Sequence, residues 1–431
     1  MNENQQTEML FPTAFNEAVE AFHLLKQQHQ QTKIGIFVLH LGGLTRIHST
    51  YGFSVVRQAF QKVNKRLTAY TTGLGHYFSI QETKYYLYYA EQDGLTLQQF
   101  AEGVINLFAE PLRFAAYEFY LQAKVGLSVL PDDGSDLETL LKNAEAASYY
   151  LKNEKIKRVG VFTPETNALL FKKVFYENNL IDAVKNKEFL LYYQPKICAH
   201  TGRIISLEGL VRWDHPLMGL VPPGEFVSLA EENGLIHLLG EIVLEKGVRF
   251  LSLLQSKNLD ISITINVSAE QLLSGNLLPY IQNLLAANPI PTHRLGLEIT
   301  ENINLYDLEY VIEQLHTLRD MGIKVYLDDF GTGYSSLQYL QQLPLDVLKI
   351  DRAFVMNLEE REVDQLIIRS IVGISKKLDL EIVAEGVENP RQLEILRSLG
   401  CSQLQGYLFS KPLPEDDILS FIETYSPVYF S

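Results

Sequence analysis

The stretches RLGLEITE (294–301) and KVYLDDF (324–330) each join a short apolar run to carboxylates at its end, with a helix-like segment between them. The same unit recurs along the C-terminal part of the chain, in FLLYYQPKI (189–197), IISLEGLVRW (204–213), ISITINVS (261–268), DVLKID (346–351), EIVAEGV (381–387) and LQGYLF (404–409). Strand-like runs interleaved with helices over about 250 residues are typical of a (β/α)₈ barrel. We therefore predict a barrel of this type for the second half of the chain.

Polar side chains stand at or near the ends of these runs, where a barrel gathers its active site. In chain order they are Glu208, Asn266, Glu298, Asp328, Lys349, Glu385 and Gln405, and Asp329 follows Asp328 directly. Carboxylate and amide oxygens suit Mg²⁺, Mn²⁺ or Ca²⁺. Carboxylates crowded at one barrel mouth repel one another strongly unless cations lie between them. The pattern therefore predicts bound divalent metal.

Two divalent ions ~3.5–4 Å apart are the usual apparatus of phosphodiester hydrolysis. Asp328 and Asp329 stand at a strand end, where the backbone turns, so they could serve two ions with one carboxylate bridging. Lys349 would orient a water, take part in its proton transfer or neutralise phosphate charge, and the sequence leaves these three roles open. A single strand-end carboxylate is more often a solvated cap than a ligand. Capping does not explain oxygen ligands at so many successive strand ends.

From about Phe171 onward the chain resembles the EAL domain, a bacterial phosphodiesterase of the messenger cyclic di-GMP. The matching stretches occur in the family's order and are YYQPKI (192–197), LEGLVRWDHP (207–216), INVSAEQL (265–272), LEITEN (297–302), YLDDFGTGYSSLQYL (326–340), LKIDRAFV (348–355), IVAEGVEN (382–389) and GCSQLQGYLFSKPLP (400–414). The resemblance implies a modified (β/α)₈ barrel with one antiparallel strand. It also implies a homodimer, coupled to the glycine-containing loop 331–336.

The resemblance also assigns roles to residues. It implies two Mg²⁺ or Mn²⁺ ions, with Ca²⁺ as an inhibitory ion, and the metal ligands Glu208, Asn266, Glu298, Asp328, Asp329 and Glu385. Lys349 matches the catalytic lysine, and Glu208 and Glu385 share the catalytic centre. Glu301 matches the glutamate that holds the loop DDFGTGYSS (328–336). Positions near the dinucleotide or the catalytic centre are Gln194, Leu210, Arg212, Gln405 and Glu388.

One departure lies in the motif that names the family, where Gly209 gives EGL in place of EAL. An alanine-to-glycine change removes one methyl group and loosens a strand by roughly 0.5–1 kcal/mol. It removes neither a ligand nor a charge. We expect the activity to be retained, at a level that the sequence does not give.

The first half of the chain alternates strand-like and helix-like segments and predicts a small α/β domain. Its strand-like runs are IGIFVLHL (34–41), YYLYYA (85–90), EFYLQAKVGLSVL (118–130) and RVGVF (158–162). The segments TRIHSTYGFSVVRQAF (45–60) and LLKNAEAASYYLKNEKIKRVGVF (140–162) resemble the GGDEF domain, the diguanylate cyclase module. His40 stands where that family has a metal-binding aspartate, and His48 and Arg57 replace two guanine-contacting residues. The signature loop has become roughly QETKY (81–85). Cyclisation of GTP needs Mg²⁺ held by carboxylates, so we expect a degenerate domain with a dimerising or regulatory role. Whether it binds GTP stays open.

The composition sets broader limits. The chain has 431 residues, 37 basic and 52 acidic side chains, a net charge of −15 and 46% hydrophobic residues. This balance excludes a mainly disordered chain and disfavours a nucleic-acid polymer as partner, because phosphate backbones are held by dense lysine and arginine. The two cysteines cannot build a disulfide framework, the N-terminus does not resemble a signal peptide, and the apolar runs are shorter than the ~20 residues of a membrane span. We expect a cytoplasmic protein without membrane contact.

The expected organisation has four parts. Residues 1–30 form an N-terminal helical segment, 31–163 the degenerate GGDEF-like domain, 164–185 a linker helix and barrel entry, and 186–431 the EAL domain. The leading hypothesis is hydrolysis of cyclic di-GMP to linear pGpG. A receptor that holds cyclic di-GMP without cutting it, and a protein-interaction scaffold, are the alternatives. EAL receptors typically lose metal ligands, and none is lost here.

Overall fold

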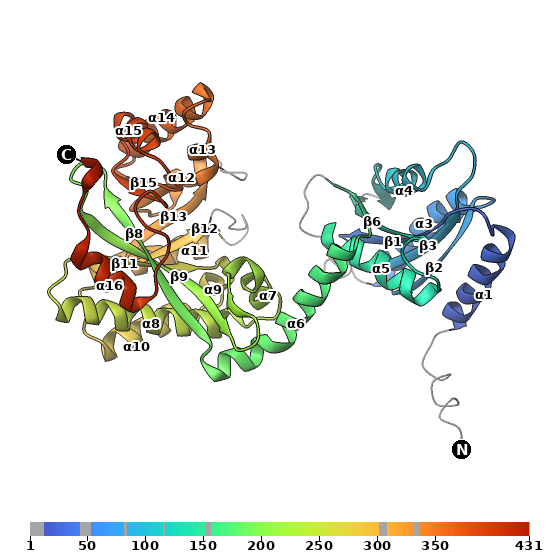
Figure 1. Ribbon diagram of the computed structural model, residues 1–431, viewed down its shortest axis with the longest axis horizontal. Helices are drawn as coiled ribbons and strands as arrows, with labels where there is room; N and C mark the ends of the chain where they lie inside the picture. The colour runs from blue at the N-terminus through green and yellow to red at the C-terminus, as the bar shows by residue number, and fades with distance from the viewer. Residues whose placement is uncertain are drawn as a thin grey trace, which may run out of the picture. The chain divides into compact units, whose positions relative to one another are not determined.

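The structure is a computed structural model, and it describes residues 13–43, 53–81, 84–114, 117–151, 157–300, 308–331 and 337–430. The chain forms two compact units, residues 1–175 and 176–431, which Figure 1 shows in blue to green and in green to red. The border falls inside one helix, α6 (Pro164–Asn186). This helix covers the expected linker 164–185.

The first unit is built on a five-stranded sheet in the order β2-β3-β1-β6-β7. Its strands are β1 (Ile34–Gly42), β2 (Gly75–Gln81), β3 (Lys84–Ala90), β6 (Gln122–Leu130) and β7 (Val159–Val161). The central strand β1 pairs antiparallel with both β3 and β6, and only the β6–β7 pair in this sheet is parallel. A small hairpin of β4 (Leu112–Phe114) and β5 (Tyr117–Phe119) lies outside the sheet. The runs that carry β1, β3, β6 and β7 were predicted, whereas β2 and β4 were not.

Helices cover both faces of this sheet. The core on one face contains Phe37 and Leu39 of β1 with side chains of α3 (Phe53–Thr71) and α4 (Leu97–Asn106). The core on the other face joins Ile36 and Val38 to α1 (Thr13–Gln28) and α5 (Leu137–Tyr150). The alternation of residues 36 to 39 between the two cores is the period of two expected for a strand buried on both sides. Because α1 contributes the buried Phe22 to this core, residues 13–28 pack as part of the unit rather than as a segment apart.

The second unit is a closed barrel, in the strand order β9-β11-β12-β13-β14-β15-β16-β8 with β8 also paired to β9. The bounds are β8 (Phe189–Cys198), β9 (Ile204–His215), β11 (Ser262–Val267), β12 (Leu295–Thr300), β13 (Lys324–Phe330), β14 (Val347–Ile350), β15 (Glu381–Ala384) and β16 (Gln403–Gln405). Every run predicted for the barrel carries one of these strands. Strand β8 is antiparallel to both neighbours while the others run parallel, which confirms the modified barrel.

Helices follow most of the parallel strands and surround the barrel (Figure 1). They are α7 (Val227–Glu232), α8 (Ile236–Ser256), α9 (Ala269–Leu273), α10 (Leu277–Ala287), α11 (Leu308–Asp320), α12 (Leu337–Gln342), α13 (Arg352–Met356), α14 (Glu362–Lys377), α15 (Pro390–Leu399) and α16 (Glu415–Thr424), and the short strand β10 (Gly219–Val221) extends the sheet beside β9. Ser268 and Asn389 begin α9 and α15 with capping boxes. Such caps satisfy amide groups that a helix start leaves unpaired.

The single tryptophan of the chain anchors the entry to the barrel. Trp213 on β9 is fully buried, and its indole nitrogen donates a hydrogen bond of 2.9 Å to Glu188. Its ring packs against Tyr176, Phe189 and Phe226. Trp213 therefore ties the second half of α6 to the first strands of the barrel, and its fluorescence reports on this unit alone.

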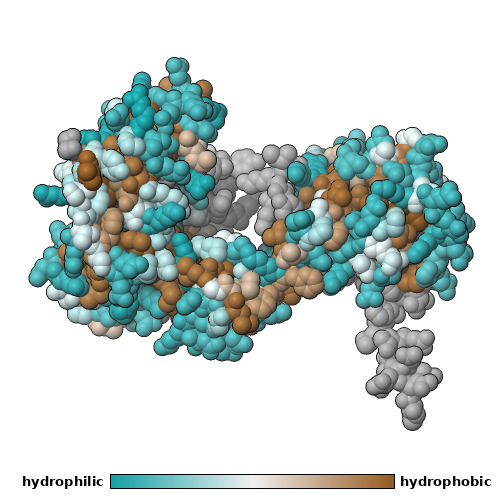
Figure 2. Space-filling view, viewed as in Figure 1, coloured by the Kyte–Doolittle hydropathy of each residue, from teal (hydrophilic) through white to brown (hydrophobic). Residues whose placement is uncertain are grey.

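The surface of both units is mostly hydrophilic on the face that Figure 2 shows, with hydrophobic residues along α6. On this helix Leu169, Phe171, Val174 and Ile181 are exposed. None of the helices in the described part of the chain combines enough length with enough apolar character to span a lipid bilayer.

Candidate active site

Lys349 lies at the centre of a group of carboxylates inside the barrel. Its side chain on β14 is 1% exposed, and its Nζ contacts one oxygen from each of four other segments. The distances are 2.7 Å to Glu385, 3.0 Å to Asp328 and 3.5 Å to Glu208, and a short contact joins Nζ to Glu298. The structure thus brings together the predicted lysine and four of the predicted carboxylates, which are spread along the chain from position 208 to position 385.

A second buried lysine, Lys196 on β8, contacts the other oxygen of Glu298. Its Nζ donates a 2.8 Å hydrogen bond to the Thr264 hydroxyl and lies 4.8 Å from the centre of the Tyr326 ring. Glu298 is therefore held between two ammonium groups. Lys196 was not among the site residues predicted from the sequence. The period of two along a strand places it on the same face as Gln194, and this was the signal that could have found it.

Amide side chains fix the orientation of Glu208. The Asn266 amide donates a hydrogen bond of 2.9 Å to one oxygen of Glu208, and the Gln405 amide donates one of 2.7 Å to the other. The Gln405 amide also donates to the Gln194 oxygen at 3.0 Å, and Gln194 donates in turn to the Ser410 carbonyl at 3.1 Å. Because both Glu208 oxygens accept hydrogen bonds from amides, this carboxylate is preorganised.

The electrostatics of the group separate its carboxylates. Burial disfavours the charged form of Glu298, but Lys196 and Lys349 outweigh it and lower the pKa of Glu298 to about 2. Burial, only partly offset by Lys349, raises the pKa of Asp328 to about 6 and that of Glu385 to about 8. The surrounding carboxylates hold the pKa of Lys349 well above its usual value despite burial. Glu298 is thus ionised at neutral pH, whereas the surroundings of Asp328 and Glu385 oppose their charged forms.

The donor set fits a divalent ion. Glu208, Glu298 and Asp328 each offer an oxygen, and these oxygens lie within 4.8 Å of one another. The four carboxylates around Lys349 outnumber the two lysines, so the group carries an excess of negative charge that a hard cation would offset. This cluster is where a metal ion would bind.

Asp329 lies apart from the other carboxylates of the predicted ligand set. Asp329 is exposed, and partial burial of its carboxylate and the nearby Asp351 raise its pKa. The Asp329 backbone has φ of 56°, a left-handed conformation that a non-glycine residue rarely adopts, and its N–H donates 2.9 Å to Asp328. The backbone therefore turns between the two aspartates, as expected. Among the described residues, the clustered carboxylate oxygens do not include that of Asp329.

A cavity of about 210 Å³ opens over the cluster. Predicted residues that line it are Gln194, Glu208, Leu210, Asp328, Lys349, Glu385, Glu388 and Gln405. Lining residues that the sequence analysis missed are Arg352, Met356, Gly386, Gly406 and Tyr407, each within or close to a motif already quoted. Glu388 is exposed, and its backbone N–H donates to Gln392.

Arg212 lies near the cavity without lining it. This half-buried side chain donates to the Val211 carbonyl over 2.8 Å and lies 5.7 Å from the ring centre of Tyr192. Burial lowers the pKa of its guanidinium. Its predicted role at the dinucleotide stays a prediction. Glu301 and most of the loop 331–336 lie outside the described residues, as does His48 in the first unit.

The described residues of the predicted cyclase motif lie on strands and one helix of the first unit. His40 is exposed near the end of β1, and Arg57 is exposed on α3. In QETKY (81–85), Gln81 ends β2 and Lys84 begins β3, and these two residues pair. His40 and Lys84 are thus register partners on the neighbouring strands β1 and β3.

Comparison with protein families identifies two domains in tandem. The family described as diguanylate cyclase, GGDEF domain, matches residues 13–158, and the family described as EAL domain matches residues 177–412. A bifunctional diguanylate cyclase/cyclic di-GMP phosphodiesterase of Pseudomonas aeruginosa, MucR, is 32% identical over 90% of this chain and 57% of its own length. The cyclic di-GMP phosphodiesterase PdeR of Escherichia coli is 31% identical over 89% of this chain and 58% of its own length.

Solved structures match the barrel unit. The MucR phosphodiesterase in complex with c-di-GMP is 40% identical, with 57% of this chain and 99% of that chain covered and a TM-score of 0.54. An EAL domain protein from Listeria monocytogenes is 33% identical over 57% of this chain and 98% of that chain, with a TM-score of 0.53. The chain spans less than three fifths of the length of MucR and PdeR. The EAL match alone covers more than half of this chain, and the barrel carries the family's motifs in order, so the chain belongs to the EAL domain family.

Proposed function

We propose that the barrel hydrolyses one phosphodiester bond of cyclic di-GMP to give linear pGpG, in a metal-dependent reaction. The observation that carries the proposal is Lys349, buried among four carboxylates at the floor of an open cavity. The names of MucR and PdeR, and the cyclic di-GMP bound in the MucR structure, support the same activity.

The ions proposed are two Mg²⁺ or Mn²⁺, held by Glu208, Asn266, Glu298, Asp328, Asp329 and Glu385. When bound, such ions supply a hydroxide nucleophile and stabilise the charge that develops on phosphate. Hydrogen bonds from Asn266 and Gln405 preset Glu208 for this role. Ca²⁺ is proposed to inhibit, because it takes more ligands at longer and more flexible distances than Mg²⁺.

Lys349 is proposed to act on the attacking water. Its ammonium reaches three of the proposed ligands within 3.0 Å or by a short contact, so a water bound among them lies within hydrogen-bond range. The surrounding carboxylates raise the pKa of Lys349 despite its burial. The roles proposed for it are orientation of the water, a part in its proton transfer and neutralisation of phosphate charge. Lys196 is proposed as the residue that keeps Glu298 ionised and fixed.

The cavity accepts part of the substrate. Ligand pockets usually measure about 300–1,000 Å³, so 210 Å³ suits the scissile phosphodiester and not the whole dinucleotide. Arg352 and Tyr407 line the cavity and are exposed. They are proposed to meet the second phosphate and a guanine base, alongside the predicted Gln194, Leu210, Arg212 and Glu388.

The first unit is proposed to lack cyclase activity and to serve regulation or dimerisation. His40 and Lys84 offer no carboxylate for Mg²⁺ at the strand positions they hold. The chain is further proposed to form a homodimer. The exposed apolar side chains Met356, Val363 and Leu366, on the packed helices α13 and α14, support self-association of the barrel.

The test is turnover of cyclic di-GMP by the purified full chain with Mg²⁺, Mn²⁺, Ca²⁺ or EDTA, with the product identified by mass. The proposal expects pGpG with Mg²⁺ or Mn²⁺ only. Stoichiometric binding with intact nucleotide after long incubation would replace the enzyme by a receptor. A parallel incubation with GTP and Mg²⁺ expects neither cyclic di-GMP nor pGpG, because the barrel would convert any cyclic di-GMP that formed into pGpG. Light scattering reports the oligomeric state.

A further inference from the structure

The two buried lysines of the barrel hold Glu298 in different ways. Lys349 contacts one oxygen of Glu298 and reaches three further carboxylates of the proposed ligand set. Its ammonium therefore lies among the oxygens that a metal ion would bind. Lys196 contacts the other oxygen of Glu298, and in the described part of the chain no second carboxylate forms an ion pair with it.

Two further side chains hold the ammonium of Lys196. Its Nζ donates a hydrogen bond of 2.8 Å to the Thr264 hydroxyl and lies 4.8 Å from the centre of the Tyr326 ring, a contact that attracts a cation. A Cβ at Gly296 would lie 2.6 Å from a Tyr326 ring carbon and 2.9 Å from the Thr264 methyl group. The glycine thus leaves the room in which Thr264 and Tyr326 take these places beside Lys196.

The strand positions beside Lys196 are neutral. Its register partners are Ser206 on β9 and Gln405 on β16. The ion pair with Glu298 is therefore the main compensation of its charge among the described residues. Glu298, in turn, faces two ammonium groups before any metal ion binds.

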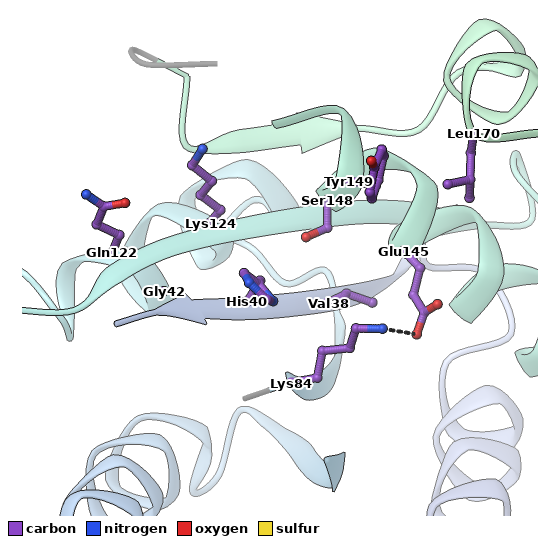
Figure 3. Close-up of a pocket in the computed structure, with 10 residues that line it drawn as sticks. All are labelled: Val38, His40, Gly42, Lys84, Gln122, Lys124, Glu145, Ser148, Tyr149 and Leu170. Carbon is purple, nitrogen blue, oxygen red and sulfur yellow. Dashed lines mark hydrogen bonds and ion pairs between the residues drawn. The ribbon is translucent and has the colours of Figure 1, made fainter. Parts of the chain in front are cut away.

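Lys84 in the first unit shows how an accessible lysine differs from Lys196. It lines a cavity of about 360 Å³, where His40 is the register partner of both Lys84 and Lys124 (Figure 3). It forms an ion pair of 3.4 Å with Glu145, the dashed line in Figure 3, and both partners are about one third exposed. Water and salt screen such a pair. The side chain of Lys196 is 0% exposed, so its charge acts on the barrel interior without this screening.

A fixed ammonium beside a ligand opposes the binding of a divalent cation. Like charges repel, and the repulsion is stronger in a buried site than in water. Lys196 also engages the Glu298 oxygen that Lys349 does not contact, which leaves Glu298 one oxygen for an ion. In the absence of metal the same ion pair spares the barrel an uncompensated buried carboxylate, which would be strongly destabilising.

We propose that Lys196 is a built-in counter-ion that weakens metal binding at Glu298 and lets the barrel fold with its metal site empty. It is a positioning residue, because it acts through Glu298 and not on the substrate. The proposal rests on the metal-dependent function proposed above. Its consequence is that the barrel exchanges its ions readily, and that removal of the Lys196 charge tightens their binding.

The test is Mn²⁺ binding by the full chain without nucleotide, measured from the electron paramagnetic resonance signal of free Mn²⁺. Lys196→Met should lower the Kd for Mn²⁺ about tenfold or more, because the competing charge is lost and both Glu298 oxygens become available. Lys196→Gln should also tighten binding, and its amide can still donate to Thr264 or Glu298, so it serves if the methionine variant does not fold.

Two control variants locate the effect. Lys324→Met removes a lysine of the same barrel that forms only an exposed ion pair with Glu381, and it should leave the Kd unchanged. Glu208→Gln removes a carboxylate of the cluster and should weaken Mn²⁺ binding, which assigns the measured ion to the barrel.

Urea unfolding followed by Trp213 fluorescence gives a second readout. Saturating Mn²⁺ should raise the unfolding midpoint of Lys196→Gln more than that of the wild-type chain, because a ligand of the folded state stabilises it more when it binds more tightly. A lysine with a merely structural role would change the midpoint equally with and without Mn²⁺.

Equal or weaker Mn²⁺ binding in both Lys196 variants overturns the proposal. So does a wild-type chain that binds no Mn²⁺, or binding that Glu208→Gln leaves unchanged. Hydrolysis of cyclic di-GMP is measured on the same preparations. Intact nucleotide together with the expected Lys196 effect refutes the hydrolase and not the counter-ion, whereas hydrolysis with an unchanged Kd refutes the counter-ion alone.

Discussion

The barrel centre and the cavity of the first unit are both built from ionisable side chains on neighbouring strands, but the two groups differ in charge. In each, ionisable side chains from neighbouring strands lie at one level of a sheet. The barrel closes, so strands far apart in sequence turn their side chains toward Lys349, and carboxylates predominate. The open sheet sets only a row across three strands, and there basic residues predominate. The comparison teaches that the sheet supplies proximity, whereas the residue types at each level decide the local charge.

The largest effect is expected at Lys349. Lys349→Ala should lower turnover of cyclic di-GMP by roughly 10²–10⁴-fold, the usual contribution of a positioned proton donor or acceptor. Lys324→Ala is the matched control, because Lys324 lies on the adjacent strand β13 and forms only an exposed ion pair with Glu381. It should leave the rate nearly unchanged. Equal rates for Lys349→Ala and wild type would show that Lys349 takes no part in the reaction. The carboxylates around it could then not be assigned to a catalytic centre.

A large loss of stability is expected at Lys196. Lys196→Met leaves one oxygen of the buried Glu298 without its cation, and breaking a buried pair costs about 3–5 kcal/mol. Urea unfolding followed by Trp213 fluorescence measures this cost for the barrel alone. Lys324→Met, at an exposed pair, should cost about 1 kcal/mol or less. A small effect at Lys196 would show that Lys349 alone compensates Glu298.

The pH dependence of barrel stability sharpens the comparison further. The pKa of Glu385, about 8, and that of Asp328, about 6, lie above those of the unfolded chain, so between pH 4.5 and 8 the folded state binds more protons. Stability in EDTA should therefore fall as pH rises through this window, by up to a few kcal/mol. Trp213 fluorescence checks this, and Glu385→Gln or added Mg²⁺ should flatten the slope. A stability that rises over the same window would contradict the prediction.

The contribution of Glu298 to barrel stability has the opposite pH dependence. Its pKa of about 2 lies below that of an unfolded glutamate, so its stabilising contribution is complete above pH 4.5 and is lost as pH falls toward 2. Acid unfolding of the barrel below pH 4.5 should therefore be weaker in a Glu298→Gln variant, although that variant is less stable at neutral pH.

The smallest effect is expected at Gly209. A Cβ at this position would meet the Ile265 Cδ1 at 2.7 Å, and that same methyl group lies 2.8 Å from a Cβ built at Gly247. Ile265 thus fills the space that an alanine would occupy, and its flexible end can shift. Gly209→Ala should change turnover less than about twofold and stability by about 1 kcal/mol or less. A large loss of either would show that the EGL sequence is matched to a rigid neighbour.

The sequence was most informative where burial dictates the pattern. Every barrel strand lies in a run predicted from the sequence, with polar residues at or near its end, and the resemblance supplied the antiparallel strand. Strand β2 was missed because GHYFSIQ (75–81) mixes polar and aromatic residues at the sheet edge, and β4 because it is only three residues long.

The site shows the same limit at the level of contacts. The sequence named Lys349 and the carboxylates, but the sharing of Glu298 between two lysines depends on β8 closing the barrel, which no local pattern shows. The row of His40, Lys84 and Lys124 was missed for the same reason, since its members meet only through strand register. The domain borders, the dimer and the roles of Arg212, Glu388 and Glu301 stay predictions.

The closing pair of the barrel has a consequence for biosynthesis. Strand β8 pairs with β16, so that Cys198 lies opposite Gln403. A ribosome releases the N-terminal sheet, whose strands all lie within residues 34–161, long before it reaches residue 403. Until then β8 exposes an unpaired edge, and unpaired edges invite association with other nascent chains. The early unit can mature during translation, whereas the barrel must wait for its last strand.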